Sequence, residues 1–432
     1  MSKSFEENEY SGLIKKILIT LLIICIYKLM TYITLPGIDP RQIIDLSLES
    51  NFLKFINKLS GGGIDKFSIL AINTLPYINA TMITQILCSK LGIKEFQELK
   101  KNRESGGSKL NNYTKLFTVV IGFFNSFYLC HVMANAHIQE RSLIFIGKNL
   151  FYMINIPLLI CGSFITIWLS SLITKHGVAN GGSILVLVNL LSLSPISFDK
   201  LLAAYRLKEV TLHLIILIGL FYFVLICISL FIELCYRKIK VKSLDTNEDL
   251  PLNQIDLRIN NVGVLSLTTA SILIHFPQLL ITILKNIGFS TYTCERYIAY
   301  FSIGGKYYFL IYGIFVVFMT LLQSDIVFDP EEISKALQDM NVVLVGIRPG
   351  KTTNEHLKNI INKLNIISAL YLVTICISTE YYMKYINSIL GQNVINISGS
   401  AIVIGVGITK SIADELSVYD YNKILQKHGA KD

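Results

Sequence analysis

The chain has 432 residues, of which 52% are hydrophobic and 16% are charged, and its formal net charge at pH 7 is +9. Together with a mean hydropathy of +0.53, this composition excludes an ordinary soluble globular domain. On so apolar a chain, the positive charge indicates cytoplasm-facing loops and contact with anionic lipid headgroups before it indicates nucleic acid. We therefore expect a polytopic α-helical membrane protein.

Ten apolar segments are predicted to be membrane-spanning helices. A helix needs about 20 residues to cross a hydrocarbon core about 30 Å thick, and the second and fifth segments are shorter than that. In chain order the predicted spans are residues 13–34, 75–90, 116–134, 151–174, 181–196, 210–234, 262–284, 307–328, 360–378 and 397–417. The first apolar run is too long for a signal peptide and lacks a small-residue cleavage site, so we expect it to remain as a span.

The distribution of positive residues predicts which side the termini face. Ten spans place both termini on one side, and the tails and even-numbered loops carry the majority of the Lys and Arg residues. Because positively charged loops stay in the cytoplasm, we expect the termini there or in the equivalent compartment of an organelle. The longest polar loops, residues 89–115, 235–261 and 329–359, fall on that side.

The second apolar run is interrupted twice. Three glycines at positions 61–63 free the chain before it, and Asn73 and Pro76 break it in the middle, since proline cannot donate to a helix ladder. We predict a half-helix over residues 61–73, followed by a longer helix that begins near Pro76. Broken backbone at membrane depth is tolerated only against protein or a water-filled cavity. The segment thus indicates a pore or binding site, with a re-entrant packing segment as the alternative.

The loop after the eighth span predicts a protruding helix and a rigid turn. Asp329 is a good N-cap, Pro330 suits the first helical position, and two glutamates follow at the positive end of the helix dipole. Gly346, Pro349 and Gly350 then shape a turn that presents Arg348. A fixed arginine suits an acidic partner or RNA phosphates, and the alternative is a solvated charge.

The sequence carries none of the enzyme or metal-site signatures that we considered. The eight cysteines are scattered without a CxxC pair, the seven histidines are dispersed, and neither HExxH nor GxSxG occurs. The string GKT at positions 350–352 lacks the glycine that a phosphate loop requires at position 345. We expect no enzyme activity and no cofactor.

Ionisable residues inside the predicted spans are few. Lys28 lies about two-thirds of the way across the first span, and Glu233 and Asp325 lie near span ends. An ion-coupled carrier normally needs such groups near the midplane. The scarcity of such groups therefore disfavours an ion-coupled transporter, and a solute transporter or ion channel is kept as the alternative to a larger pore.

A series of motifs resembles the SecY family. The motifs are LPGID at position 35, SGGGIDKFSILAINTLPYI at position 60, ITKHGVANGGSI at position 173, RINNVGVLSLTTASILIHFP at position 258, VFDPEEISKALQDM at position 327 and VGIRPGKTT at position 345. They run in one order from about residue 12 to residue 417. The resemblance implies a passive protein-conducting channel of ten transmembrane helices, which passes unfolded polypeptides across the membrane or laterally into it.

The family's clamshell architecture implies two pseudo-symmetric halves of five helices. On this chain they are residues 13–196 and 197–417, between a tail of residues 1–12 and a tail of residues 418–432. The resemblance places a lateral gate between the second and seventh spans. It also implies that residues 61–73 form the plug of the idle channel. The plug residues expected on this basis are Gly61, Gly62, Gly63, Ile64, Phe67, Ile69 and Leu70.

The family seals around the moving chain with a ring of apolar side chains. The matching positions in this sequence are Thr74, Ile78, Gly182, Val186, Thr268 and Ile404. Apolar constrictions block ions by dewetting, and three of these positions carry Thr or Gly. Either the ring is looser here, or the neighbours Leu75, Ile184 and Leu267 supply the seal, or the alignment is shifted by one residue.

The resemblance also implies partners. Family loops dock the motor ATPase SecA and the ribosome, and the matching positive positions are Arg237, Lys238 and Arg348 with Pro349. A small SecE-like clamp subunit is expected in trans, with a SecG-like subunit as a possible third member. The richness in Ile, Lys and Asn suggests an AT-rich plastid genome, hence a thylakoid membrane with stromal termini; the alternative is a bacterial inner membrane with cytoplasmic termini.

Overall fold

The structure is a computed structural model. It describes residues 2–38, 57, 60–89, 92–101, 106–135, 137–138, 141–142, 144–207, 210–243, 254–260, 262–263, 265–271, 273–274, 308–327, 329–348, 350–390 and 399–429. The chain divides into two compact units, one of residues 1–198 with 408–432 and one of residues 199–407. We call them the N-terminal unit and the C-terminal unit. The predicted halves, 13–196 and 197–417, stay a prediction.

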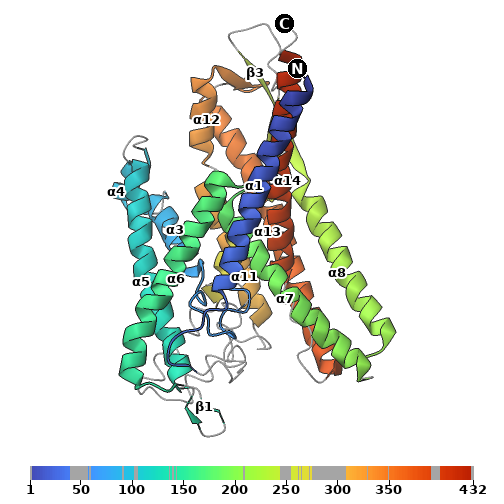
Figure 1. The fold of residues 1–432 in the computed structure, drawn as a ribbon. Helices are drawn as coiled ribbons and strands as arrows, with labels where there is room; N and C mark the ends of the chain where they lie inside the picture. The colour runs from blue at the N-terminus through green and yellow to red at the C-terminus, as the bar shows by residue number, and fades with distance from the viewer. Residues whose placement is uncertain are drawn as a thin grey trace. The chain divides into compact units, whose positions relative to one another are not determined.

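The N-terminal unit is built from long helices (Figure 1). Its elements are α1 (Ser2–Met30), α3 (Leu75–Cys88), α4 (Lys94–Lys101), α5 (Gly106–Asn135), β1 (His137–Ile138), β2 (Arg141–Ser142), α6 (Lys148–His176) and the first part of α7 (Gly181–Arg206). Helix α5 packs against both α3 and α6, and α6 also packs against α1. Several helices extend beyond their predicted spans, because the spans counted apolar residues only and a helix continues into polar sequence of adequate propensity.

The C-terminal unit combines helices with a small sheet. Its labelled elements are α8 (Leu212–Glu233), β3 (Tyr236–Ser243), β4 (Gln254–Arg258), α11 (Tyr308–Val327), α12 (Pro330–Asp339), β5 (Val342–Leu344), α13 (Lys351–Leu390) and the first part of α14 (Gly399–Gly429). Residues 263, 265–271 and 273–274 are also helical, and they open the seventh predicted span. The rest of that span, residues 275–284, lies outside the described residues.

The predicted helix after Asp329 is confirmed. Helix α12 begins at Pro330, and the Asp329 side chain accepts a hydrogen bond from the backbone N–H of Glu331 at 3.0 Å. This satisfies one of the four N–H groups that a helix start leaves without a partner. Figure 1 shows α12 near the start of α13, against which it packs.

The long polar loops of the C-terminal unit fold together into one sheet, which the sequence interpretation missed. Strand β3 pairs antiparallel with both β4 and β5, in the order β4-β3-β5. One face is apolar and packs on α12 and the start of α13, with a core of Ile239, Val241, Leu257, Leu337, Leu344, Leu357, Ile361 and Leu364. We call β3, β4 and β5 the docking sheet, after the role predicted for Arg237 and Lys238.

Apolar side chains on the outer faces of the helices fit a lipid environment. In α8, for example, Leu220 is 62% exposed and Phe223 is 66% exposed. Among the described residues, four helical stretches are long and apolar enough to cross a membrane: Gly106–Ala134, Lys148–His176, Leu212–Glu233 and Lys351–Ser388. Exposed apolar surface on this scale would be costly in water. An all-α membrane protein, as predicted, accounts for it.

Candidate functional site

The plug segment, residues 61–73, is a chain of turns. The predicted half-helix is wrong, because no residue from 60 to 74 is helical. Four residues in it have positive φ, namely Gly61 (64°), Gly62 (85°), Phe67 (49°) and Asn73 (53°). A left-handed residue cannot continue a right-handed helix. The backbone instead closes short turns, such as Phe67 N–H to Ile64 C=O at 2.9 Å.

The plug segment is hydrogen-bonded to the part of the chain that precedes it. The Asn57 side-chain oxygen accepts from the backbone N–H of Ile64 at 3.2 Å. Farther along, Leu35 N–H donates to Phe67 C=O at 2.7 Å, and Ile69 N–H donates to Ile33 C=O at 3.0 Å. These bonds give the irregular backbone partners within the protein, as membrane depth demands.

Close packing against the helices holds the segment in place. Ile64, Phe67 and Leu70 are fully buried, and Leu70 belongs to a core cluster with residues of α1, α6 and α7. The Ile69 carbonyl lies so close to Gly162 of α6 that a Cβ there would approach its oxygen to 2.2 Å. Gly162 is therefore required for this close approach of two backbones.

A buried polar cluster, which we call the latch, fastens the end of the plug segment. Tyr27 Oη of α1 accepts from Asn73 Nδ2 at 2.8 Å and donates to Asn189 Oδ1 of α7 at 3.0 Å. Lys28 Nζ lies 3.5 Å from the same Asn189 oxygen and also donates to Ser192 Oγ. The latch thus joins α1, the plug segment and α7. Its central members Tyr27, Asn73 and Asn189 are buried, while Lys28 and Ser192 are partly buried.

The predicted ring positions divide between the two units. Thr74, Ile78, Gly182 and Val186 belong to the N-terminal unit, and Thr268 and Ile404 belong to the C-terminal unit. Thr74, Thr268 and Ile404 are buried, while the other three positions are partly buried. Whether these positions form a ring stays a prediction.

The structure bears on the polar character of one predicted ring position. The Thr268 hydroxyl donates to the backbone carbonyl of Leu265 at 2.8 Å. A hydroxyl bonded within its own helix leaves the methyl group as the outward part of the side chain. Thr268 therefore presents a less polar surface to its surroundings than a threonine whose hydroxyl is free. The alternative neighbour Ile184 packs in the core with Tyr27 and Leu70.

The docking sheet presents positive charge on its open face. Arg237 and Lys238 are exposed, and Lys240 and Lys242 follow with the alternation of a strand, opposite the buried Ile239 and Val241. Lys238 stands directly across from Asp256 of β4. Lys238, Lys240 and Lys242 therefore form a row on the face turned away from the apolar core, whereas Arg237 is exposed at the start of the strand and has the same alternation as Ile239.

Arg348 lies on a well-anchored turn. Its carbonyl accepts from the hydroxyls of Thr352 and Thr353 at 2.5 Å and 2.9 Å. Gly346 (φ 83°) and Gly350 (φ 104°) supply the left-handed conformations that the turn needs. The Arg348 side chain is exposed, so the predicted presentation is confirmed; Pro349 lies outside the described residues.

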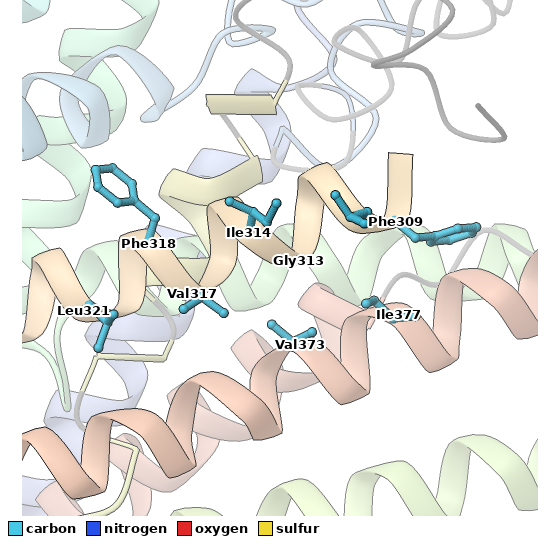
Figure 2. A pocket seen from close by; sticks show the side chains of 9 residues that line it. Phe309, Gly313, Ile314, Val317, Phe318, Leu321, Val373 and Ile377 are labelled. Atoms are coloured by element: carbon cyan, nitrogen blue, oxygen red, sulfur yellow. The ribbon is translucent and has the colours of Figure 1, made fainter. Parts of the chain in front are cut away.

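A groove of about 530 Å³ runs between α11 and α13. Figure 2 shows Val373 and Ile377 of α13 facing α11 across it, with Gly313 of α11 opposite them. The remaining lining residues come from α11: Phe309, Leu310, Ile314, Val317, Phe318 and Leu321. A solute site needs some polar groups to orient its ligand. This groove offers none and suits hydrocarbon.

Sequence reasoning missed Tyr27 and Asn189 of the latch and the buried hydrogen bond between Glu233 and Asn260. Polar residues inside apolar segments were the available signal, since buried polar groups in a membrane protein are normally paired. No group of three or more His, Cys, Asp or Glu side chains suited to a metal ion occurs in the part of the chain that the structure describes.

Comparison with known proteins gives consistent matches. The family model of SecY matches residues 68–413. The protein translocase subunit SecY of Rickettsia typhi is 26% identical over 428 residues, covering 97% of this chain and 96% of the relative. That of Porphyra purpurea is 29% identical over 430 residues, covering 96% and 98%. A solved protein-conducting channel superposes with a TM-score of 0.64 at 15% identity, over 95% of this chain and 93% of the other, and shares its fold.

Proposed function

This chain belongs to the SecY family, and we infer that it is the protein-conducting channel subunit of a protein translocase. It is an integral membrane protein. One observation of the structure carries the inference: an irregular segment, residues 61–73, is buried among α1, α6 and α7. Such backbone belongs in a membrane protein only where protein or a water-filled path surrounds it.

We propose that the plug segment closes the idle channel and leaves its place when a polypeptide passes. Its turns carry few regular hydrogen bonds, so it can rearrange without unwinding a long helix. The latch supports this role, because Asn73 stands at the end of the segment and its amide is bonded to Tyr27 of α1 at 2.8 Å. Opening then requires that bond to be exchanged for water or for the moving chain.

The seal around the moving chain is proposed to use Thr74, Ile78, Gly182, Val186, Thr268 and Ile404. The internal hydrogen bond of Thr268 supports an apolar lining at that position, since its methyl group is left to face outward. An apolar constriction excludes ions by dewetting and yields to side chains of any chemistry. This suits a channel whose substrates differ in sequence.

The docking sheet and the Arg348 turn are the proposed attachment points for a driving partner. Exposed Arg237, Lys238 and Arg348 offer cations on rigid backbone, which favours acidic protein surfaces or RNA phosphates. The partners proposed on the family resemblance are a SecA-type motor ATPase and the ribosome. A SecE-like subunit, with or without a SecG-like subunit, would hold the channel together.

The chain has no catalytic role in this proposal, and the partner supplies the energy. We propose the thylakoid membrane of a plastid as its location, with the termini in the stroma, on the basis of the Ile, Lys and Asn content. The alternative is a bacterial inner membrane. Locating the gene on a plastid chromosome, or failing to find it there, decides between them.

The test is transport by the purified chain with its partner subunit in proteoliposomes. A channel imports an unfolded secretory precursor of any length in the presence of the motor and ATP, and the imported chain becomes protected from external protease. The alternative, a solute carrier, predicts saturable uptake of a small solute and no protease-protected precursor. Protection that is equal with and without the chain would overturn the proposal.

A further inference from the structure

Three buried polar side chains meet where the docking sheet joins the helices of the C-terminal unit. Asn260 Nδ2 donates to Glu233 Oε1 at 2.6 Å, and Ser368 Oγ of α13 donates to Asn260 Oδ1 at 2.9 Å. Glu233, Asn260 and Ser368 are 5%, 5% and 1% exposed. We call these three residues the clamp.

The direction of the hydrogen bonds makes Asn260 the central member of the clamp. An ionised carboxylate only accepts, and here the serine donates its hydroxyl proton, so the residue between them must both donate and accept. An asparagine amide does both. An aspartate at this position would place a second carboxylate against Glu233 in a buried site, where like charges repel strongly.

The Asn260 side chain lies directly against Gly263, where a larger residue would not fit. A Cβ on Gly263 would lie 2.2 Å from Asn260 Oδ1 and 2.3 Å from Nδ2. Glycine at 263 therefore allows the helix that starts here to pass directly over the Asn260 side chain. The clamp is in this way packed against the first turn of that helix.

On one side the clamp is continuous with the docking sheet. The β3–β4 ladder ends with Tyr236 opposite Arg258. Beyond it, Ile259 N–H donates to Cys235 C=O at 3.2 Å, and the next link is the side-chain bond between Asn260 and Glu233. The hydrogen bonds of the sheet thus continue without a gap into those of the clamp.

On the other side the clamp leads into the helix that carries Thr268. Residues 263 and 265–271 are helical, and Ser266 N–H donates to Val262 C=O at 2.8 Å. The same helix is held to α11, because Gln323 Nε2 donates to Thr269 Oγ1 at 3.0 Å. Fewer than ten residues separate Asn260 from the proposed ring position at Thr268.

We propose that the clamp couples the docking sheet to the helix of Thr268, so that a partner moving the sheet also moves this part of the proposed pore. The proposal rests on the proposed function. A buried polar group cannot leave its hydrogen-bond partner without a desolvation cost, so Asn260 stays bound to Glu233 when the sheet is displaced. Displacement then passes into the helix and is not absorbed at the junction.

Charge rescue tests the proposal. Asn260→Asp breaks the clamp by removing a donor and adding a charge, whereas Glu233→Gln combined with Asn260→Asp restores one donor and one acceptor, with their positions exchanged. Asn362→Asp, at an exposed position on α13, is the matched control. Each variant is assayed in proteoliposomes for motor binding by co-sedimentation and for motor-driven import of an unfolded precursor.

We expect Asn260→Asp to lower the import rate about tenfold, in the usual range of coupling energies, with motor affinity unchanged within twofold. The double variant should recover most of the lost rate, and Asn362→Asp should match the unchanged chain. Ser368→Ala removes one hydrogen-bond donor from the clamp without adding a charge. It replaces Asn260→Asp as the test variant if that variant does not accumulate, and it should lower the import rate severalfold.

Three results would overturn the coupling role. They are import at the normal rate with Asn260→Asp, no recovery in the double variant, and a parallel loss of motor binding, which would mark the clamp as a support of the sheet alone. A failure of the proposed function is distinct, because the unchanged chain would then import nothing.

Discussion

Replacing Tyr27 with phenylalanine removes one oxygen atom from the latch and leaves the ring in place. Asn73 Nδ2 loses its acceptor at 2.8 Å, while Asn189 Oδ1 retains Lys28 Nζ at 3.5 Å. Depriving a buried donor of its acceptor costs about 1–3 kcal/mol. The cost falls on the closed arrangement, because in the open arrangement water replaces the lost partner. Tyr27→Phe should therefore destabilise the closed form by about 1–3 kcal/mol relative to the open form.

A shift of about 1–3 kcal/mol changes a two-state equilibrium by roughly 5- to 150-fold. We therefore expect Tyr27→Phe to raise the ion leak of the idle channel, measured as current across a planar bilayer without a substrate polypeptide. Tyr113→Phe, at an exposed tyrosine of α5, is the matched control and should leave the leak unchanged. A Tyr27→Phe channel as tight as the unchanged channel would refute the reasoning that the latch holds the plug segment closed.

Three further changes give separate tests. Gly162→Ala places a Cβ 2.2 Å from the Ile69 carbonyl oxygen, which should destabilise the closed form by about 1–3 kcal/mol. A raised ion leak of the idle channel would support this close packing. An unchanged leak together with unchanged thermal stability would contradict it. Arg348→Glu should abolish motor-driven import while membrane insertion and subunit assembly stay normal, whereas Lys335→Glu on exposed α12 should have little effect; normal import with Arg348→Glu would make this arginine a solvated charge. Thr268→Val should keep the idle channel tight, because the threonine hydroxyl is already bonded within its helix, and a leak in this variant would show that the hydroxyl faces the seal.

The helices were largely predictable from the sequence, because apolar runs of membrane length leave little choice of structure. Asp329 and Pro330 likewise located the start of α12 to the residue. The plug segment was recognised as broken but given the wrong local structure. Three consecutive glycines and Asn73 were evident, yet the left-handed φ of Phe67 depends on its burial in the N-terminal unit, which no local pattern reveals.

The sequence contained a pattern that predicts strand β3 of the docking sheet, and the sequence interpretation did not use it. Residues 236–243 read YRKIKVKS, with Ile239 and Val241 alternating with lysines, which is the period of a half-buried strand. Its pairing with β5 was not predictable, since Val241 and Leu344 are about a hundred residues apart in the chain. The same limit hid the latch and the clamp, whose members come from distant segments.

The most direct test of the channel is whether a polypeptide in transit passes its proposed centre. Photo-reactive amino acids at Ile78 and Ile404, one from each unit, are combined with a precursor arrested partway by a folded domain at its end. The account predicts that both positions cross-link to the arrested chain, and that neither does so when the precursor is released. Efficient arrest without cross-linking at either position would contradict a polypeptide path through this subunit.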